Sequence, residues 1–286
     1  MGPACTACDA GAAGSLVCMS WVERAREWAD RLHPRGLLYS TYEQRLLAEL
    51  DRNRLPRHVA VLADGNRRWA RLNAPGQPLV VGYQAGADKL REFVSWCDEV
   101  GIRVVTLWVL STENLARNQE DVAPLLDVIE SLFIDLASTG RWRVKLVGDP
   151  TLLPETMTDA LRAAEFDTAS VGGLQVNVAI AYGGRHELRD AVRRLLAAEA
   201  EKGTTLAELS ESVDIDDIAE HLYTAGDPDP DLIIRTSGEQ RLSGFLMWQS
   251  AHSEFYFHEA LWPDFRRVDF LRALRSYASR ERRYGR

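Results

Sequence analysis

The sequence predicts an α/β fold: a single domain with a central, mostly parallel, six-stranded sheet flanked by helices. Short apolar runs rich in β-branched residues recur along the chain. Segments whose apolar residues have helical spacing separate these runs, and such alternation is typical of a parallel sheet covered by helices. The chain has 286 residues, of which 46% are hydrophobic, so it can bury a substantial core. That length suits one large domain or two small ones.

The charge and the cysteines narrow the class of protein. The formal net charge is −8, which argues against general affinity for nucleic acid or anionic membranes. Any anionic substrate must therefore be held by a local cluster of arginines. Cys5 and Cys8 form a lone C-x-x-C without a second pair, so we expect reduced thiols in a cytoplasmic protein. No stretch approaches the ~18 apolar residues of a membrane span.

The N-terminal part is predicted to differ from the rest. Residues 1–18 are expected to be a disordered tail, and residues 19–55 to form N-terminal helices over 20–33 and 40–51. The first helix carries Trp21 and Trp28 on one apolar stripe. That stripe favours packing against the domain, while a peripheral contact with a membrane or an apolar product stays open. Pro56 then precedes the main domain, residues 56–286.

Along the main domain, short apolar runs that favour strands alternate with segments whose apolar residues have helical spacing. Runs that favour strands lie at 58–63, 104–110, 142–147, 174–181, 232–236, 244–249 and 255–258. Helical spacing is found over 83–100, 119–138, from about 154, over 185–201, 214–223 and 263–281. Ligands of such sheets bind outside the carboxyl ends of the strands, so the polar segments that follow the apolar runs are the candidate site.

The first candidate segment follows the run 58–63. Asp64 comes directly after it, and the next residues are Gly65, Asn66, Arg67, Arg68 and Trp69. A carboxylate at a strand end followed by free backbone amides at a helix start can hold a metal ion or a phosphate. The alternative is an aspartate N-cap with exposed arginines.

The second segment follows the run 104–110. It crowds hydroxyl, carboxylate and amide groups into Ser111, Thr112, Glu113 and Asn114, with Arg117 just beyond. These groups are suited to a polar substrate, although a capping box in an ordinary turn has a similar composition.

The third segment is the most specific. Arg235 and Arg241 lie six residues apart around a glycine turn, with Leu242 and Ser243 behind the second arginine. Arginine binds phosphate through paired, charge-assisted hydrogen bonds, so this segment predicts an anion site. Glu254 follows among apolar and aromatic neighbours, as a functional acid or as a member of a structural ion pair.

Together these segments resemble one known family. The runs HVAVLADGNRRWA, LSTENLARN, NVAIAYGGRHEL, DPDLIIRTSGEQRLSGFLMWQSAHSEFYF and LWPDFRRVDFLRAL resemble, in this order, the cis-prenyltransferase (undecaprenyl diphosphate synthase-like) family. The resemblance runs from about residue 56 to the C-terminus and is closest to short-chain actinobacterial members that make (2Z,6E)-farnesyl diphosphate. It implies that 56–286 is a catalytic domain with an apolar tunnel for the prenyl chain.

The resemblance also implies roles for individual residues. Asp64 matches the aspartate that binds Mg²⁺ and the allylic diphosphate, and Glu254 matches a second metal contact. Asn114 matches the residue that assists proton removal. The substrate-binding positions are matched by Gly65, Asn66, Arg67, Arg68, Trp69, Ser111, Thr112, Glu113, Arg117, Arg235, Arg241, Leu242 and Ser243. Of these, Arg235, Arg241 and Ser243 match the isopentenyl diphosphate pocket. Arg283 and Gly285 match a motif that reaches a partner's site, which implies a homodimer.

Two departures from the family pattern bear on substrate and product. Leu79 and Tyr83 stand where an arginine and a histidine are usual, which removes one expected phosphate contact. Val109 matches a tunnel-floor position, flanked by Trp108 and Leu110. A bulky floor predicts one condensation on geranyl diphosphate, giving (2Z,6E)-farnesyl diphosphate. The alternatives are a long-chain synthase with a deeper tunnel and a non-catalytic subunit that stabilises a partner synthase.

Overall fold

The computed structural model describes residues 34–280. The chain divides into two compact units, residues 1–45 and residues 46–286. Of the first unit, the described part is the beginning of α2 (Pro34–Glu49), a helix that starts earlier than the predicted 40–51. The tail 1–18, the helix 20–33 and the motif of Arg283 and Gly285 lie outside the described residues.

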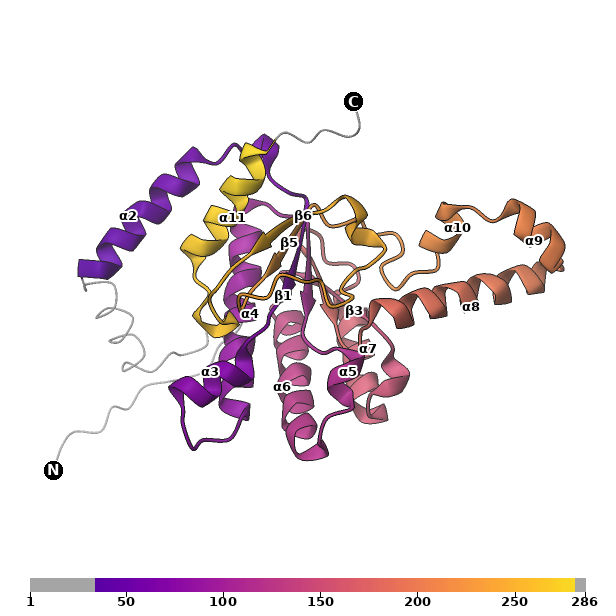
Figure 1. Ribbon diagram of the computed structural model, residues 1–286, viewed down its shortest axis with the longest axis horizontal. Helices are drawn as coiled ribbons and strands as arrows, with labels where there is room; N and C mark the ends of the chain where they lie inside the picture. Colours follow the sequence, from indigo (N-terminus) through magenta and orange to yellow (C-terminus); the bar gives the residue numbers. More distant parts are fainter. Residues whose placement is uncertain (1–33, 281–286) are drawn as a thin grey trace, which may run out of the picture. The chain divides into compact units, whose positions relative to one another are not determined.

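The second unit is built on a six-stranded sheet in which every neighbouring pair is parallel (Figure 1). The strand order is β3-β4-β2-β1-β5-β6. The strands are β1 (His58–Leu62), β2 (Val104–Trp108), β3 (Arg143–Val147), β4 (Gln175–Ala179), β5 (Leu232–Arg235) and β6 (Glu254–Phe257). The predicted fold class is confirmed. Because all strands are parallel, their carboxyl ends meet at one edge, called here the carboxyl edge.

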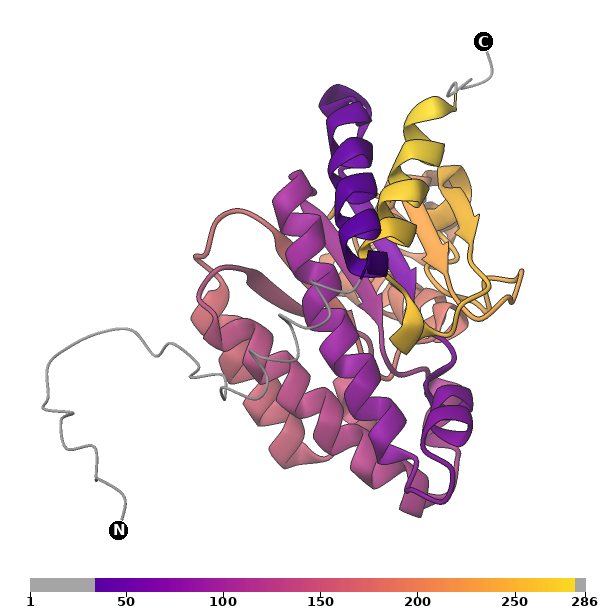
Figure 2. The same cartoon turned by 90° about the vertical axis from the view of Figure 1, so that its left-hand side faces the viewer.

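Helices cover one face of the sheet. α4 (Val80–Val100), α6 (Gln119–Ser138) and α7 (Glu155–Thr168) lie side by side on it (Figures 1 and 2). α11 (Arg267–Ser279) joins α4 through an edge-to-face contact of Phe270 with Phe93, with ring centroids 5.1 Å apart. The remaining helices are α3 (Asn66–Asn73), α5 (Thr112–Leu115), α8 (Gly184–Lys202), α9 (Leu206–Ser212) and α10 (Ile215–Ala219). Short 3₁₀ turns lie at Arg52–Arg54, Pro150–Leu152, Gln249–His252 and Trp262–Asp264.

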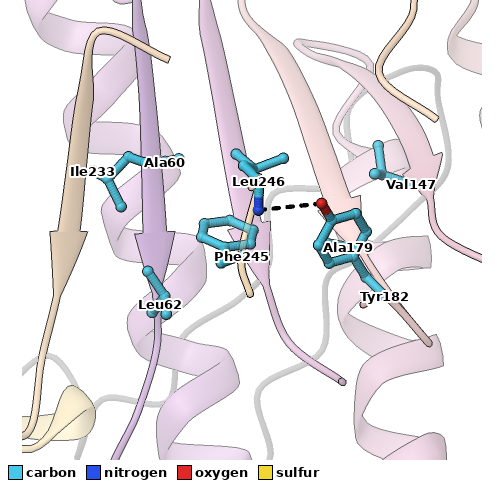
Figure 3. Packing of buried hydrophobic residues seen from close by; sticks show 8 residues of the cluster. All are labelled: Ala60, Leu62, Val147, Ala179, Tyr182, Ile233, Phe245 and Leu246. Atoms are coloured by element: carbon cyan, nitrogen blue, oxygen red, sulfur yellow. Dashed lines mark hydrogen bonds between the residues drawn. The ribbon is translucent and has the colours of Figure 1, made fainter. Parts of the chain in front are cut away.

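Near the carboxyl edge, the other face of the sheet is covered by an irregular segment. Figure 3 shows Phe245 and Leu246 lying over strand residues that include Ala60, Leu62 and Ala179. Phe245 and Leu246 are both 0% exposed. The apolar character of this segment therefore comes from covering the sheet.

The prediction of a strand over 244–249 is wrong for that reason. Gly244 has φ of +85° and Leu246 has φ of +46°, and neither value is compatible with an extended strand. A short apolar run has the same composition whether it pairs in a sheet or packs on one. The helix predicted over 214–223 is shorter in the structure, where it is α10, and α9 was not predicted. No helix among residues 34–280 has the length and apolar character needed to cross a membrane.

Candidate active site

A cavity of about 400 Å³ opens at the carboxyl edge of the sheet. Among residues 34–280, its charged lining consists of one carboxylate and six guanidinium groups, from Asp64, Arg67, Arg68, Arg71, Arg117, Arg235 and Arg241. The protein as a whole is acidic, with a net charge of −8, so the positive charge of this lining is local. Such a cavity attracts an anion that carries several negative charges.

The segment after β1 forms the first wall. Gly65 has φ of +111° and caps α3, whose first-turn amides follow it. A Cβ at Gly65 would lie 2.9 Å from Leu261 Cδ2, so only glycine fits this turn. Asp64 donates its backbone N–H to Thr236 Oγ1 at 3.1 Å, and its side chain is 44% exposed. The turn thus presents a carboxylate and free amides to the cavity.

Arg235 joins this wall to the opposite one. It ends β5 and is 4% exposed. Its Nη2 donates to Asp64 Oδ2 at 3.3 Å, and its Nη1 donates to Ser243 Oγ at 3.0 Å and to the carbonyl of Arg241. Its Nε is buried and has no hydrogen-bond partner among the described residues. Asp64, Arg235 and Arg241 therefore share one cavity, as the sequence predicted.

The segment after β2 forms the third wall. Ser111 caps α5 by accepting a hydrogen bond from the N–H of Asn114 at 3.2 Å. Ser111, Asn114 and Arg117 all line the cavity. Burial, and next the nearby Arg67, lower the pKa of the Arg117 guanidinium. An anion placed between these two arginines relieves their repulsion.

Tyr83 on α4 contributes a group that the sequence analysis gave no role. It lines the cavity and is 5% exposed, and its hydroxyl is buried without a hydrogen-bond partner in the described part of the chain. Burial raises the pKa of this phenol, which keeps it protonated and able to donate. A buried donor without a partner, on a residue that lines a cavity, can be satisfied by a ligand atom. From the sequence, Tyr83 was named only as a departure from the family pattern, because a tyrosine on the apolar stripe of a helix gives no local sign of a polar role.

The residues expected to set the length of the product lie in the apolar part of the lining. Trp108, Val109 and Leu110 all line the cavity, together with Leu125 of α6. Trp108 stacks on Phe245 with ring centroids 4.9 Å apart, which fixes this wall. Arg71 and Leu125 also line the cavity and were not predicted, because their contribution depends on how α3 and α6 pack. Leu62 and Ala63, at the end of β1, line it as well.

Several predicted residues do not line the cavity. The indole N–H of Trp69 donates to Asp264 at 2.8 Å, and Thr112 lies 3.3 Å from a ring nitrogen of His186. Leu242 packs against the buried cluster shown in Figure 3, and Glu113 is absent from the lining.

The position of Glu254 requires a correction. It is the first residue of β6 and pairs with Arg280. Because β6 is parallel to β5, its first residue lies at the edge opposite Asp64. A single chain therefore does not bring Glu254 beside Asp64 as a second metal contact. Within residues 34–280, no group of three or more His, Cys, Asp or Glu side chains could hold a metal ion.

Known proteins similar to this chain are named as isoprenyl transferases or as synthases of prenyl diphosphates. "(2Z,6E)-farnesyl diphosphate synthase" from Thermobifida fusca is 58% identical over 87% of this chain and 97% of that protein. "Isoprenyl transferase 1" from Streptomyces avermitilis is 56% identical over 88% of this chain and 97% of that protein. Among solved structures, lavandulyl diphosphate synthase from Lavandula x intermedia, in complex with dimethylallyl diphosphate, has a TM-score of 0.75 and 35% identity, covering 82% of this chain and 100% of that chain.

The match to a family model covers most of the chain. The model of the Prenyltransf family, described as "Putative undecaprenyl diphosphate synthase", matches residues 62–285. That range contains all six arginines of the cavity, together with Asp64 and Tyr83. The chain belongs to the undecaprenyl diphosphate synthase family of prenyltransferases.

Proposed function

We propose that this chain is a cis-prenyltransferase that joins isopentenyl diphosphate to geranyl diphosphate, giving (2Z,6E)-farnesyl diphosphate and diphosphate. The observation that carries the proposal is the cavity, where six arginines and Asp64 adjoin an apolar wall. Two prenyl diphosphates present the matching chemistry, because each has a charged head and a greasy tail. The name of the Thermobifida fusca relative, (2Z,6E)-farnesyl diphosphate synthase, supports the product.

The charge of the lining fits two diphosphates better than one. The arginines form two groups: Arg67, Arg68 and Arg71 on α3, and Arg235 and Arg241 around the segment after β5, with Arg117 near the first group. In the proposed complex the α3 group holds the allylic diphosphate and the β5 group holds isopentenyl diphosphate. Each diphosphate then meets at least two arginines, whose guanidinium groups are charge-assisted donors.

We further propose that the cofactor is Mg²⁺. Mg²⁺ is usually held by one or two carboxylates and by substrate phosphates, so a lone exposed carboxylate within an arginine-rich cavity fits it. Asp64 would supply that carboxylate, and its present partner Arg235 Nη2, at 3.3 Å, already orients the side chain. The bound ion would supply charge stabilisation for the departing diphosphate.

The proposed reaction breaks the bond between C1 of the allylic substrate and its diphosphate oxygen. Arg67 and the amides at Gly65 hold the departing group, and the Tyr83 hydroxyl donates to one of its oxygens. The double bond of isopentenyl diphosphate then forms the new carbon–carbon bond, and a proton leaves its C2. An amide is a poor base, so Asn114 orients and relays this proton while a diphosphate oxygen accepts it. Preorganised donors of this kind lower the barrier because charge develops where they already point.

Product length follows from the apolar wall. Val109, Leu110 and Leu125 line the cavity, and Trp108 is held against Phe245, so the wall yields little to a longer chain. Forcing more carbon into a packed wall costs typically about 1–3 kcal/mol. We therefore favour a single condensation over the long-chain alternative.

One assay tests the proposal against both alternatives. Radiolabelled isopentenyl diphosphate is incubated with dimethylallyl, geranyl or farnesyl diphosphate and Mg²⁺, and the products are sized. We expect farnesyl diphosphate from geranyl diphosphate, loss of turnover with excess chelator, and loss in Asp64→Asn. A ladder of long products supports the long-chain synthase. No product with any primer supports the non-catalytic subunit.

The assembly and location are part of the proposal. We propose a homodimer in which Arg283 and Gly285 reach the partner's site, and a cytoplasmic enzyme that contacts membranes peripherally when it hands over its product. Light scattering of the intact chain tests the dimer, and an Arg283→Ala variant that dimerises normally with unchanged turnover contradicts the role of that motif. Flotation with vesicles tests the membrane contact.

A further inference from the structure

A buried carboxyl group outside the cavity connects four segments of the chain. Glu187, in the first turn of α8, is 1% exposed. Its Oε2 accepts the hydroxyl of Tyr182 at 2.5 Å, and its Oε1 accepts Gln249 Nε2 at 3.1 Å and the N–H of Tyr223 at 3.0 Å. The same Tyr182 oxygen accepts the N–H of Leu246 at 3.1 Å (Figure 3). Burying a carboxyl group is costly unless donors surround it, and here they do.

Two of these bonds hold the segment 241–249, which has strained backbone. Ser243 has φ of +50° and Leu246 has φ of +46°, although neither is glycine. Such conformations are unfavourable for residues with a side chain and persist only where the surroundings impose them. The surroundings are the Tyr182 hydroxyl at Leu246, Gln249 bound to Glu187, and the Gly184 N–H that donates to the Gly244 carbonyl at 3.1 Å.

The strained segment begins with residues that line the cavity. Arg241 and Ser243 are part of the lining, whereas Glu187, Tyr182 and Gln249 are not. Arg235 binds the carbonyl of Arg241 and the hydroxyl of Ser243 from the cavity side. The segment is therefore clamped from two sides, by Arg235 at the cavity and by Glu187 behind it.

We infer that Glu187 is a positioning residue, which acts through Tyr182 and Gln249 to hold Arg241 and Ser243 in place for one diphosphate. The inference rests on the proposed function, since it concerns the diphosphate bound at the segment after β5. Its distinguishing consequence is selectivity between the two substrates. Loosening this clamp weakens the affinity for isopentenyl diphosphate and leaves the allylic site on α3 unchanged.

The chain offers a matched control for the test. Tyr182→Phe removes the hydroxyl that joins Glu187 to Leu246. Tyr223→Phe removes a nearby hydroxyl that also bonds a carboxylate of α8, Asp190 Oδ2 at 2.5 Å, but has no bond to the segment 241–249. Glu187→Gln is a second, volume-conserving variant. Its amide keeps only one of the two acceptor oxygens, so either the Tyr182 hydroxyl or the donors of Gln249 and Tyr223 lose their acceptor. All three are compared as full-length chains, after thermal melting shows that each folds.

Steady-state kinetics with Mg²⁺ and both substrates gives the readout, with calorimetric binding of isopentenyl diphosphate alone beside it. We expect Tyr182→Phe and Glu187→Gln to raise the KM and Kd for isopentenyl diphosphate about tenfold, the loss of one good hydrogen bond. The KM for geranyl diphosphate stays within about twofold, and Tyr223→Phe shifts neither constant by more than that. Equal shifts for both substrates, or no shift in a folded variant, overturn the positioning role while the wild-type enzyme stays active. A wild-type chain without condensation activity overturns the proposed function itself.

Discussion

Replacement of Arg235 by lysine tests the centre of the proposed site. Arg235 is 4% exposed and spans three acceptors at once, namely Asp64 Oδ2, Ser243 Oγ and the carbonyl of Arg241. Lysine retains the positive charge but lacks the planar fork that reaches acceptors on both sides of the cavity. The Arg235→Lys variant therefore isolates geometry from charge.

The expected loss of kcat/KM follows from the hydrogen bonds of Arg235 that a lysine does not form. Hydrogen bonds to charged groups contribute about 1.5–3 kcal/mol each, and at least one of the three is lost. Since about 1.4 kcal/mol corresponds to a tenfold change, kcat/KM is expected to fall about 10- to 150-fold. Lysine also removes the buried Nε, which has no partner among the described residues.

Arg241→Lys is the matched control in the same condensation assay. The side chain of Arg241 is 66% exposed and pairs at the surface with Glu239 at 2.6 Å. Solvent screens such a pair, and an exposed lysine still meets phosphate as a point charge, so a loss of less than about fivefold is expected. If Arg235→Lys stays within twofold of wild type, or loses less than Arg241→Lys, the bridging geometry of Arg235 is not what organises the site.

Three further predictions concern other parts of the molecule. Tyr83→Phe should raise the KM for geranyl diphosphate several-fold and also raise Tm, because it removes a buried, unpartnered hydroxyl; a lower Tm with unchanged KM contradicts this. Leu125→Ala should lengthen the products seen by thin-layer analysis while costing about 2–5 kcal/mol of stability; unchanged products exclude Leu125 from the chain-length wall. His58 is buried, which lowers its pKa. Below about pH 6.5 the His58 side chain is therefore protonated in the unfolded state but stays neutral in the folded state. The free energy of unfolding then falls by at most about 1.36 kcal/mol for each unit by which the pH is lowered. The stability advantage of wild type over His58→Gln should shrink in acid, as urea titrations at about pH 7.5 and 5.5 can measure; a constant difference contradicts the neutral buried state.

Much of the site was accessible from local sequence because parallel sheets have a simple rule. Asp64, Ser111 and Arg235 each follow or end a buried run, and parallel pairing carries all such positions to one edge. The rule also shows why Glu254 failed. It starts its strand, so the same geometry carries it to the opposite edge.

The sequence by itself determined the strand–helix alternation, the family and the segments that carry the chemistry, because these depend on residues adjacent along the chain. Tertiary structure alone decided that the run 244–249 covers the sheet, that Tyr83 lines the cavity, and that Glu187 bonds Gln249 in the segment behind Arg241. The physical reason is common to all three. An apolar run, a tyrosine on a helical stripe and a buried acid acquire their roles from partners far away in the chain, and local pattern does not contain those partners.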